Sequence, residues 1–341
     1  MNALVKTSAA PGLSWQDVPV PKPGPGEALV KVGHASVCGT DLLIYDWSPW
    51  AAARMSLPRI TGHEFAGEVV ETAPDVTCVS AGQRVSAESH FFCGECLQCR
   101  TGRREVCRSV RIMGVDVDGA FAEYIAVPAS NLWVNPPEIS DEWASLQEPL
   151  GNAVDTVLAE DVSGKSVLIT GAGPMGLMCA AVARACGATT IIISDPNEYR
   201  LALARKMGAD ITVKPSGGLA DTVMAATGGD GVEVFLEISG SDAAFHDGIK
   251  LLTPGGRVSL LGIFRGPVPV RLNEDVIFKK ARIYGITGRR VFGTWTTVSA
   301  LLSSGRLDLA PLITHMFPLS EYEKGFELMR SGQCGKVVFK L

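Results

Sequence analysis

The stretch Val167-Leu-Ile-Thr-Gly171-Ala-Gly173-Pro-Met175-Gly176 decides the fold of this 341-residue chain. An apolar run precedes the first glycine and an Ala-rich segment follows the third, so the glycines join a predicted strand to a predicted helix. In such a loop the first glycine permits a tight turn, the second lets the backbone approach a pyrophosphate, and the third lets the helix pack on the strand. The helix N-terminus supplies free N–H groups for the anion. The stretch therefore predicts a dinucleotide-binding site at Gly171, Gly173 and Gly176.

Asp195 supports this interpretation and selects the cofactor. It ends the next predicted strand, roughly 20 residues past the glycine loop, which is the spacing of an acid that binds the adenosine ribose. A carboxylate at this place repels a 2′-phosphate, so the sequence favours NAD over NADP. The alternative, that Asp195 only caps the following helix, stays open.

The chain around this site alternates short apolar runs with helical stretches. Such alternation is typical of βαβ units, whose strands form a parallel sheet. Six strands suit a doubly wound sheet. We predict strands at 167–170, 190–195, 210–213, 234–238, 257–261 and 281–286, and helices at 175–186, 196–207, 218–226 and 242–251, with Pro196 in the first turn of its helix.

Residues 1 to about 150 have a different texture. Short β-type runs at 28–32, 65–71 and 121–127 are separated by Gly and Pro, as in an irregular β-rich domain. From Leu309 onward the chain returns to this texture. A chain of 341 residues exceeds the roughly 250 to 300 residues that one hydrophobic core supports. We therefore predict an α/β protein with a β-rich domain at 1–150 and 291–341 and a Rossmann domain at 151–290.

Composition narrows the possible functions. The hydrophobic share of 46% and the charged share of 20% are those of a globular protein. A net charge of −5 gives no attraction to nucleic acid. The sequence contains no recognisable signal peptide or membrane-spanning run, which predicts a cytoplasmic protein. In that reducing compartment the nine cysteines favour metal ligands, reactive thiols or core residues over disulfides.

Four of the cysteines, Cys93, Cys96, Cys99 and Cys107, form the compact pattern C-x2-C-x2-C-x7-C. Four thiolates this close suit a tetrahedral zinc with no open coordination position. The predicted metal is therefore structural and holds a loop that has few apolar residues of its own. An iron–sulfur cluster and unliganded thiols are the alternatives, because thiolates alone do not select the metal.

A second predicted metal site combines Cys38, in Cys38-Gly-Thr40-Asp41, with the pair His63 and Glu64. One thiolate, one imidazole and one carboxylate leave a coordination position open for a substrate, as in catalytic zinc sites. Glu148 lies just before the predicted cofactor domain, where a ligand can come and go as the cleft closes. Any one of these residues, taken alone, can be an ordinary core or surface residue. The prediction of a metal site therefore depends on the combination of all of them.

With these motifs the chain resembles the zinc-containing medium-chain dehydrogenases along nearly its whole length, and among them those that oxidise L-threonine. Further stretches carry the resemblance: Tyr45-Asp-Trp47, Trp50, Gly119-Ala-Phe-Ala-Glu-Tyr124, Glu148-Pro-Leu-Gly-Asn-Ala153, Asp195-Pro-Asn-Glu-Tyr-Arg200 and Ile313-Thr-His315. The resemblance implies a GroES-like catalytic domain, a Rossmann domain inserted before the chain returns, and a homotetramer.

The resemblance also implies roles for single residues. Cys38, His63 and Glu64 are expected to hold the catalytic zinc, with Glu148 as an exchangeable ligand or as the partner of a substrate ammonium group. Zinc then lowers the pKa of the substrate hydroxyl, Thr40 takes the proton, and hydride passes to nicotinamide. The expected contacts of NAD are Asp195 and Arg200 at the adenosine ribose, and Met175, Leu261, Gly262, Ile263, Ile286 and Thr287 on the nicotinamide side.

Two residues depart from the family pattern. Leu43 stands where the family usually has a His that completes a proton relay, and Asp155 replaces a second usual His. Either the relay ends at Thr40 and the cofactor ribose, or Asp155 or solvent takes the place of the His. His90 is interpreted as a neighbour of the active site or as a structural His.

Three other functions fit parts of the sequence. A polyol or other secondary-alcohol dehydrogenase keeps both metals and NAD but needs no groups for an amino acid. A zinc-ribbon module that binds nucleic acid would use the four-cysteine loop and its arginines, although no stripe of aromatic and basic residues accompanies them. A dinucleotide-binding protein that has lost catalysis would explain Leu43.

Overall fold

The glycine loop belongs to a six-stranded sheet in which every neighbouring pair of strands is parallel. The structure is a computed structural model that describes residues 1–341. Along the sheet the strands follow the order β13 (Ile211–Val213), β12 (Thr190–Ser194), β11 (Ser166–Thr170), β14 (Val232–Glu237), β15 (Leu252–Leu260) and β16 (Arg282–Gly285). The chain adds strands on one side of β11 and then crosses to the other side. The crevice beyond the carboxyl ends of β11 and β14 is where such a sheet binds ligands.

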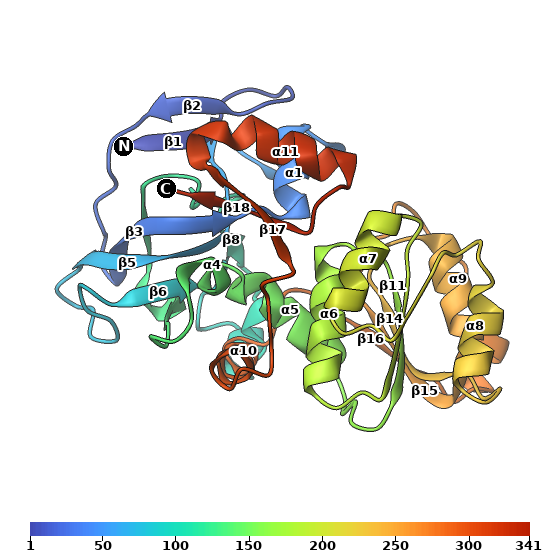
Figure 1. The fold of residues 1–341 in the computed structure, drawn as a ribbon. Coiled ribbons are helices and arrows are strands. Elements are labelled where there is room, and N and C mark those ends of the chain that lie inside the picture. Colours follow the sequence, from blue (N-terminus) through green and yellow to red (C-terminus); the bar gives the residue numbers. More distant parts are fainter.

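Four helices cover this sheet. Figure 1 shows two of them on each face: α6 (Pro174–Ala185) and α7 (Glu198–Lys206) on one, α8 (Leu219–Ala226) and α9 (Asp242–Lys250) on the other. The predicted doubly wound fold is confirmed, and its strands and helices lie within a few residues of the predicted ranges. The prediction for Pro196 is wrong, because α7 begins at Glu198. The Asn197 side chain accepts hydrogen bonds from the N–H groups of Tyr199 and Arg200, at 2.9 and 3.4 Å, and so caps the helix after the proline.

The other lobe is built on a mixed sheet around the long strand β3 (Glu27–Ser36). Its order is β10 (Leu132–Val134), β6 (Arg84–Ala87), β5 (Glu64–Thr72), β3, β18 (Lys336–Lys340) and β17 (Ile313–Pro318), and β9 (Tyr124–Pro128) also pairs with β3. The last two strands thus return to the first lobe, as predicted. The predicted run at 121–127 is only partly a strand of this sheet, since Phe121 instead accepts a hydrogen bond from the N–H of Leu4 at 2.8 Å.

Smaller elements complete this lobe. Both chain termini lie in it (Figure 1). A three-stranded sheet contains β2 (Ser14–Asp17), β1 (Asn2–Lys6) and β4 (Arg59–Ile60), and β7 (His90–Phe91) pairs with β8 (Arg111–Ile112). The remaining helices are α1 (Gly39–Tyr45), α2 (Pro49–Arg54), α3 (Leu97–Arg100), α4 (Asp141–Ala144), α5 (Gln147–Val157), α10 (Gly293–Ser303) and α11 (Tyr322–Ser331).

Three hydrophobic cores support the two sheets, and the smallest, of 12 buried residues, lies between the parallel sheet and helices α8 and α9. The largest core, of 34 buried residues, contains Ile169 and Ile191 of the parallel sheet together with Leu150 of α5 and Val298 of α10. The second core, of 26 residues, contains Phe65 and other residues of the mixed sheet. Helix α5 contacts strands of both sheets, and α10 packs on α5. The domain limits 1–150 with 291–341 and 151–290 stay a prediction. None of the helices is both long enough and apolar enough to cross a membrane.

Candidate active site

The glycine loop between β11 and α6 has the geometry that its sequence predicts. Gly171 has a φ of +95°, which permits the tight turn after the strand. A Cβ on Gly173 would meet nothing within 4 Å, so the backbone there is open to a ligand. A Cβ on Gly176 would lie 1.8 Å from the carbonyl oxygen of Gly171, so only glycine lets α6 pack this closely. These conformations fit a dinucleotide pyrophosphate at the N-terminus of α6.

Asp195 lies beside this loop at the end of β12. Its Oδ2 accepts a hydrogen bond from the N–H of Ala172 at 2.7 Å, and its Oδ1 accepts one from the N–H of Asn197 at 2.8 Å. The carboxylate therefore joins the glycine loop to the start of α7. The Nε of Arg200, one turn into α7, is buried and makes no hydrogen bond. Both side chains line the cavity described below, in agreement with a site for the adenosine ribose.

Cys38, His63 and Glu64 come together because neighbouring strands end at one place. Ser36, at the end of β3, pairs with Glu64 at the start of β5 and with Val338 in β18. Cys38 follows β3 as the N-cap of α1. One potential ligand atom from each of the three side chains lies within 4.8 Å of the others. The structure thus assembles the predicted group, while zinc ligation by it stays a prediction.

The surroundings of these three side chains suit a cation. The Oε1 of Glu64 is buried and makes no hydrogen bond, while its Oε2 accepts from Ser36 Oγ and Lys336 Nζ. The Nδ1 of His63 lies 3.5 Å from Asp41 Oδ1, and carboxylates commonly orient metal-bound imidazoles in this way. Burial lowers the pKa of His63, but the charges of Asp41 and Cys38 raise it by more, to well above its usual value. The site therefore concentrates negative charge around thiolate, imidazole and carboxylate donors, a set that fits zinc.

One cavity of about 640 Å³ joins this group to the dinucleotide loop. Cys38 and Glu64 form part of its wall, and Gly171, Gly173 and Met175 form another part. Asp195, Arg200 and Lys336 also line it. The volume is within the range of roughly 300 to 1,000 Å³ that is usual for ligand sites. An alcohol held at the Cys38 side would thus share one cavity with a bound dinucleotide.

Several predicted residues do not line this cavity, among them Thr40, His63, Glu148, Leu261, Gly262, Ile263, Ile286 and Thr287. The side chain of Ile263 is 90% exposed. Gly262 packs closely on Glu237 and Gly240, and the N–H of Ile286 donates to Leu260 at 2.9 Å. Contacts of these residues with nicotinamide stay a prediction.

Glu148, on α5, is buried in a separate network of polar side chains. Its Oε1 accepts hydrogen bonds from Ser89 Oγ at 2.5 Å and from Arg289 Nη2 at 2.6 Å. Arg289 also forms a two-point ion pair with Glu88, at 2.6 and 2.9 Å. Burial raises the pKa of Glu88, but the charge of Arg289 and the hydrogen bond with His90 lower it to about 2. The Nδ1 of His90 lies 3.1 Å from Glu88 Oε1 and 3.2 Å from Arg289 Nη2, so His90 belongs to the network that holds the predicted residue Glu148.

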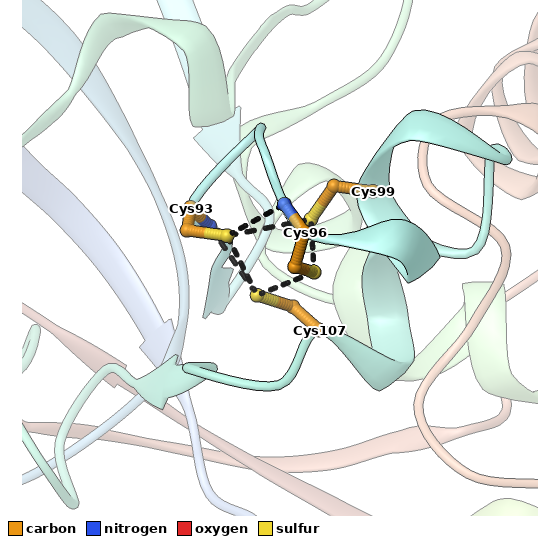
Figure 2. A group of neighbouring side chains, drawn as sticks. All are labelled: Cys93, Cys96, Cys99 and Cys107. Carbon is orange, nitrogen blue, oxygen red and sulfur yellow. Dashed lines mark hydrogen bonds between the residues drawn. The ribbon is translucent and has the colours of Figure 1, made fainter.

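The four-cysteine lobe, residues 93–107, brings its sulfur atoms together (Figure 2). Four of the Sγ–Sγ distances are 3.5, 3.5, 3.9 and 4.0 Å, close to the tetrahedral edge of about 3.8 Å that follows from a Zn–S bond of about 2.3 Å. All four are free thiols. Hydrogen bonds from the backbone of Cys99 and Arg108 lower the pKa of Cys96 to about 6, which favours the thiolate. The geometry fits a closed tetrahedral zinc site.

Comparison with known proteins assigns the chain to a family. Residues 24–137 match the alcohol dehydrogenase GroES-like domain, and residues 174–304 match the zinc-binding dehydrogenase domain. The L-threonine 3-dehydrogenase of Pyrococcus abyssi is 54% identical over 343 aligned residues, which cover 100% of this chain and 99% of that protein. The chain belongs to the L-threonine 3-dehydrogenase family of zinc-binding dehydrogenases.

Other members and structures agree with this family. The L-threonine 3-dehydrogenase of Bacillus subtilis is 49% identical and matches 99% of this chain and 98% of its own length. A short chain alcohol dehydrogenase from E. coli, crystallised with NADH, has a TM-score of 0.92 at 28% identity, covering 100% of this chain and 99% of its own. As a zinc-binding dehydrogenase, this chain is an NAD-dependent oxidoreductase that acts on CH–OH groups of a small molecule.

Sequence reasoning missed three buried residues beside the predicted ligands of this dehydrogenase: Asp41 against His63, Lys336 against Glu64, and Arg289 against Glu148. Burial lowers the pKa of Lys336, but the charges of Glu64 and Cys38 raise it by more. Asp41 lies in the motif Cys38-Gly-Thr40-Asp41, and the rule that a metal-bound His usually has a carboxylate partner could have identified it. Lys336 and Arg289 lie 272 and 141 residues from their partners, so no spacing pointed to them.

Proposed function

We propose that this zinc-binding dehydrogenase oxidises the 3-hydroxyl of L-threonine with NAD, giving 2-amino-3-oxobutanoate, NADH and a proton. The observation that carries the proposal is the single cavity that connects Cys38 and Glu64 with the dinucleotide loop. Threonine as the substrate is supported by relatives of that name, at 54% and 49% identity over essentially the whole chain.

The residues divide the chemistry between them. Cys38, His63 and Glu64 would hold zinc, which when bound supplies a Lewis acid that lowers the pKa of the substrate hydroxyl. Thr40 does not line the cavity, but its Oγ1 lies 3.8 Å from Cys38 Sγ, and its hydroxyl would pass on the proton beside this predicted zinc ligand. Leu43, which is 45% exposed, carries no titratable group, and Asp155 is paired with Arg290 at 2.6 Å. The proton therefore leaves Thr40 through the cofactor ribose and solvent.

Glu148 would distinguish an amino alcohol from a simple alcohol. Its Oε1 accepts hydrogen bonds from Ser89 and Arg289, which leaves Oε2 as the free oxygen of a side chain that is 6% exposed. That free oxygen can accept an N–H from the ammonium group of threonine. A polyol gains nothing from such a charge, which favours the amino acid.

We also propose a cytoplasmic homotetramer in which the four-cysteine lobe holds a structural zinc. Nine free cysteines suit a reducing compartment. The large apolar side chains of Ile263, Leu272, Ile277 and Phe278 are 90%, 62%, 62% and 76% exposed, and exposed apolar side chains of this kind can be covered by a second copy. Sedimentation analysis in which the protein remains monomeric at micromolar concentration would refute the assembly.

A substrate panel tests the reaction. NADH formation would be followed with L-threonine, sorbitol and 2,3-butanediol, using zinc-loaded protein and NAD or NADP. We expect the highest kcat/KM with L-threonine and NAD, and no turnover by the Cys38→Ser variant. Turnover of sorbitol or butanediol but not of threonine would replace the substrate and keep the reaction class, whereas no NADH with any alcohol would refute the enzymatic function.

A further inference from the structure

Arg289 is a buried cation whose three guanidinium nitrogen atoms all donate hydrogen bonds to side chains. Its side chain is 0% exposed. Nε and Nη2 donate to the two oxygens of Glu88, Nη1 donates to Asn152 Oδ1 at 3.0 Å, and Nη2 also reaches Ser89 Oγ at 2.9 Å and Glu148 Oε1 at 2.6 Å. Such a group is costly to bury, and it is retained only where its partners neutralise it.

We propose that Arg289 is the positioning residue for Glu148. Arg289 and Ser89 both donate to Oε1 of Glu148, so this oxygen of the carboxylate is held in place by two side chains. Glu88 holds Arg289 in turn, because its two oxygens receive the guanidinium while Trp295 Nε1 donates to Oε2 at 2.9 Å. The inference rests on the proposed function only in taking Glu148 as an active-site carboxylate.

The motif Glu148-Pro-Leu-Gly151-Asn152 is explained by this arrangement. The three polar or small positions lie on α5 and face the same guanidinium: Glu148 and Asn152 accept from it, and Gly151 makes room for it. A Cβ on Gly151 would lie 2.6 Å from Arg289 Cδ. Glycine inside a helix lowers helix stability relative to alanine, so the space for Arg289 is a physical reason for glycine here.

The same arginine connects Glu148 to the cofactor lobe. Arg289 follows β16 by a few residues, on the segment that carries Ile286 and Thr287, and the N–H of Ile286 still pairs with Leu260 of β15. Any shift of this segment on cofactor binding is therefore transmitted to Arg289 and to the carboxylate that it holds. Glu148 would reach its working position only with the parallel sheet correctly placed.

Two variants test the proposal. Gly151→Ala keeps every charge and improves helix propensity, but it displaces Arg289 by steric contact. Arg289→Lys keeps the charge but loses the forked geometry that reaches Glu88 and Glu148 together. The control for the first variant is Gly293→Ala, at an exposed position where a Cβ meets nothing within 4 Å. The control for the second is Arg282→Lys, because the side chains of Arg282 and its partner Glu160 are 44% and 25% exposed.

The measurements are kcat and KM on the best alcohol of the panel, zinc content, thermal midpoint and a crystal structure of the Gly151→Ala protein. We expect kcat/KM to fall about 10- to 100-fold in both variants, mainly in kcat, as for misplacement of a reacting group. Gly151→Ala should keep its zinc, and its crystal structure should show Arg289 withdrawn from Glu148 Oε1. Its thermal midpoint should fall, because two buried carboxylates lose part of their cation. The controls should stay within twofold of the unmodified protein.

Values of kcat/KM within twofold of the unmodified protein in both variants would overturn the proposal, as would a crystal structure in which Arg289 has left and Glu148 has not moved. If Gly151→Ala fails to fold, Arg289→Lys decides by the same kinetic criterion. Failure of threonine as a substrate is a separate result, because it is seen in the unmodified protein and leaves the comparison on another alcohol intact.

Discussion

Removal of one thiolate from the four-cysteine lobe should unfold that lobe and leave the rest of the chain folded. The perturbation is Cys99→Ser, at a buried position of the group. The lobe of about 15 residues costs at least about 15 kcal/mol of conformational free energy to order, at about 1 kcal/mol per residue. Apolar burial offsets little of this, since Leu97 and Val106 remain 60% and 41% exposed. A four-thiolate zinc site has a binding free energy of about 10–16 kcal/mol. This binding free energy nearly equals the conformational cost of ordering the lobe.

Limited trypsin digestion with zinc analysis measures the effect. Arg100, Arg103, Arg104 and Arg108 lie in or next to the lobe and provide cleavage sites. A loss of even about 3 kcal/mol raises the open population roughly 100-fold, and cleavage follows that population. We expect one zinc fewer per chain and cleavage confined to the lobe at least tenfold faster, with Cys78→Ser, an exposed cysteine outside the group, as the control. Unchanged zinc content and unchanged resistance to trypsin in Cys99→Ser would refute the reasoning.

Three further predictions concern the active-site region. Asp195→Ala removes the carboxylate held by the N–H groups of Ala172 and Asn197. The loss of an interaction of about 1.5–3 kcal/mol should raise the KM for NAD about tenfold or more. Steady-state kinetics should also show a smaller preference for NAD over NADP. The pKa of Glu88 is lowered from 4.5 to about 2. This shift contributes roughly 3 kcal/mol to the free energy of unfolding, which is present above pH 4.5 and lost as the pH falls toward 2. The difference in thermal midpoint between the unmodified protein and Glu88→Gln should therefore narrow below pH 4.5 and stay constant above it. Lys336→Met strips Glu64 of its buried cation, which should cost about 3–5 kcal/mol of stability, and a denaturation midpoint equal to that of the unmodified protein would contradict this.

Local patterns in the sequence were enough for the fold, for the glycine loop and for the two groups of potential metal ligands. The six parallel strands were predicted because each is a short apolar run next to a glycine loop or a helix, and such signals need only neighbouring residues. The four cysteines were predicted for the same reason, because their spacing alone forces their sulfur atoms together. The start of α7 was misplaced by two residues, because Asn197 and Pro196 both suit a helix start and only the structure shows which one caps it.

Residues that act on the ligands from a distance in the sequence could not be predicted in this way. A single Lys or Arg carries no spacing signal, and its usual place is the surface. Lys336 meets Glu64 only because β18 pairs with β3, which in turn pairs with β5. Arg289 meets Glu148 only because α5 contacts strands of both sheets. In both cases the sheet topology, not the local sequence, creates the contact.

This difference between local and distant partners gives the two metal sites different requirements for folding. All ligands of the four-cysteine lobe come from residues 93–107, so zinc can order that lobe without help from the rest of the chain. The group around Cys38 draws on strand β3, on the start of β5 and on Lys336 of the last strand, which is 272 residues from Glu64. It is complete only when the C-terminal strand has returned to the first lobe. Partial unfolding of β18 should therefore weaken the binding of metal at Cys38 before it affects the four-cysteine lobe.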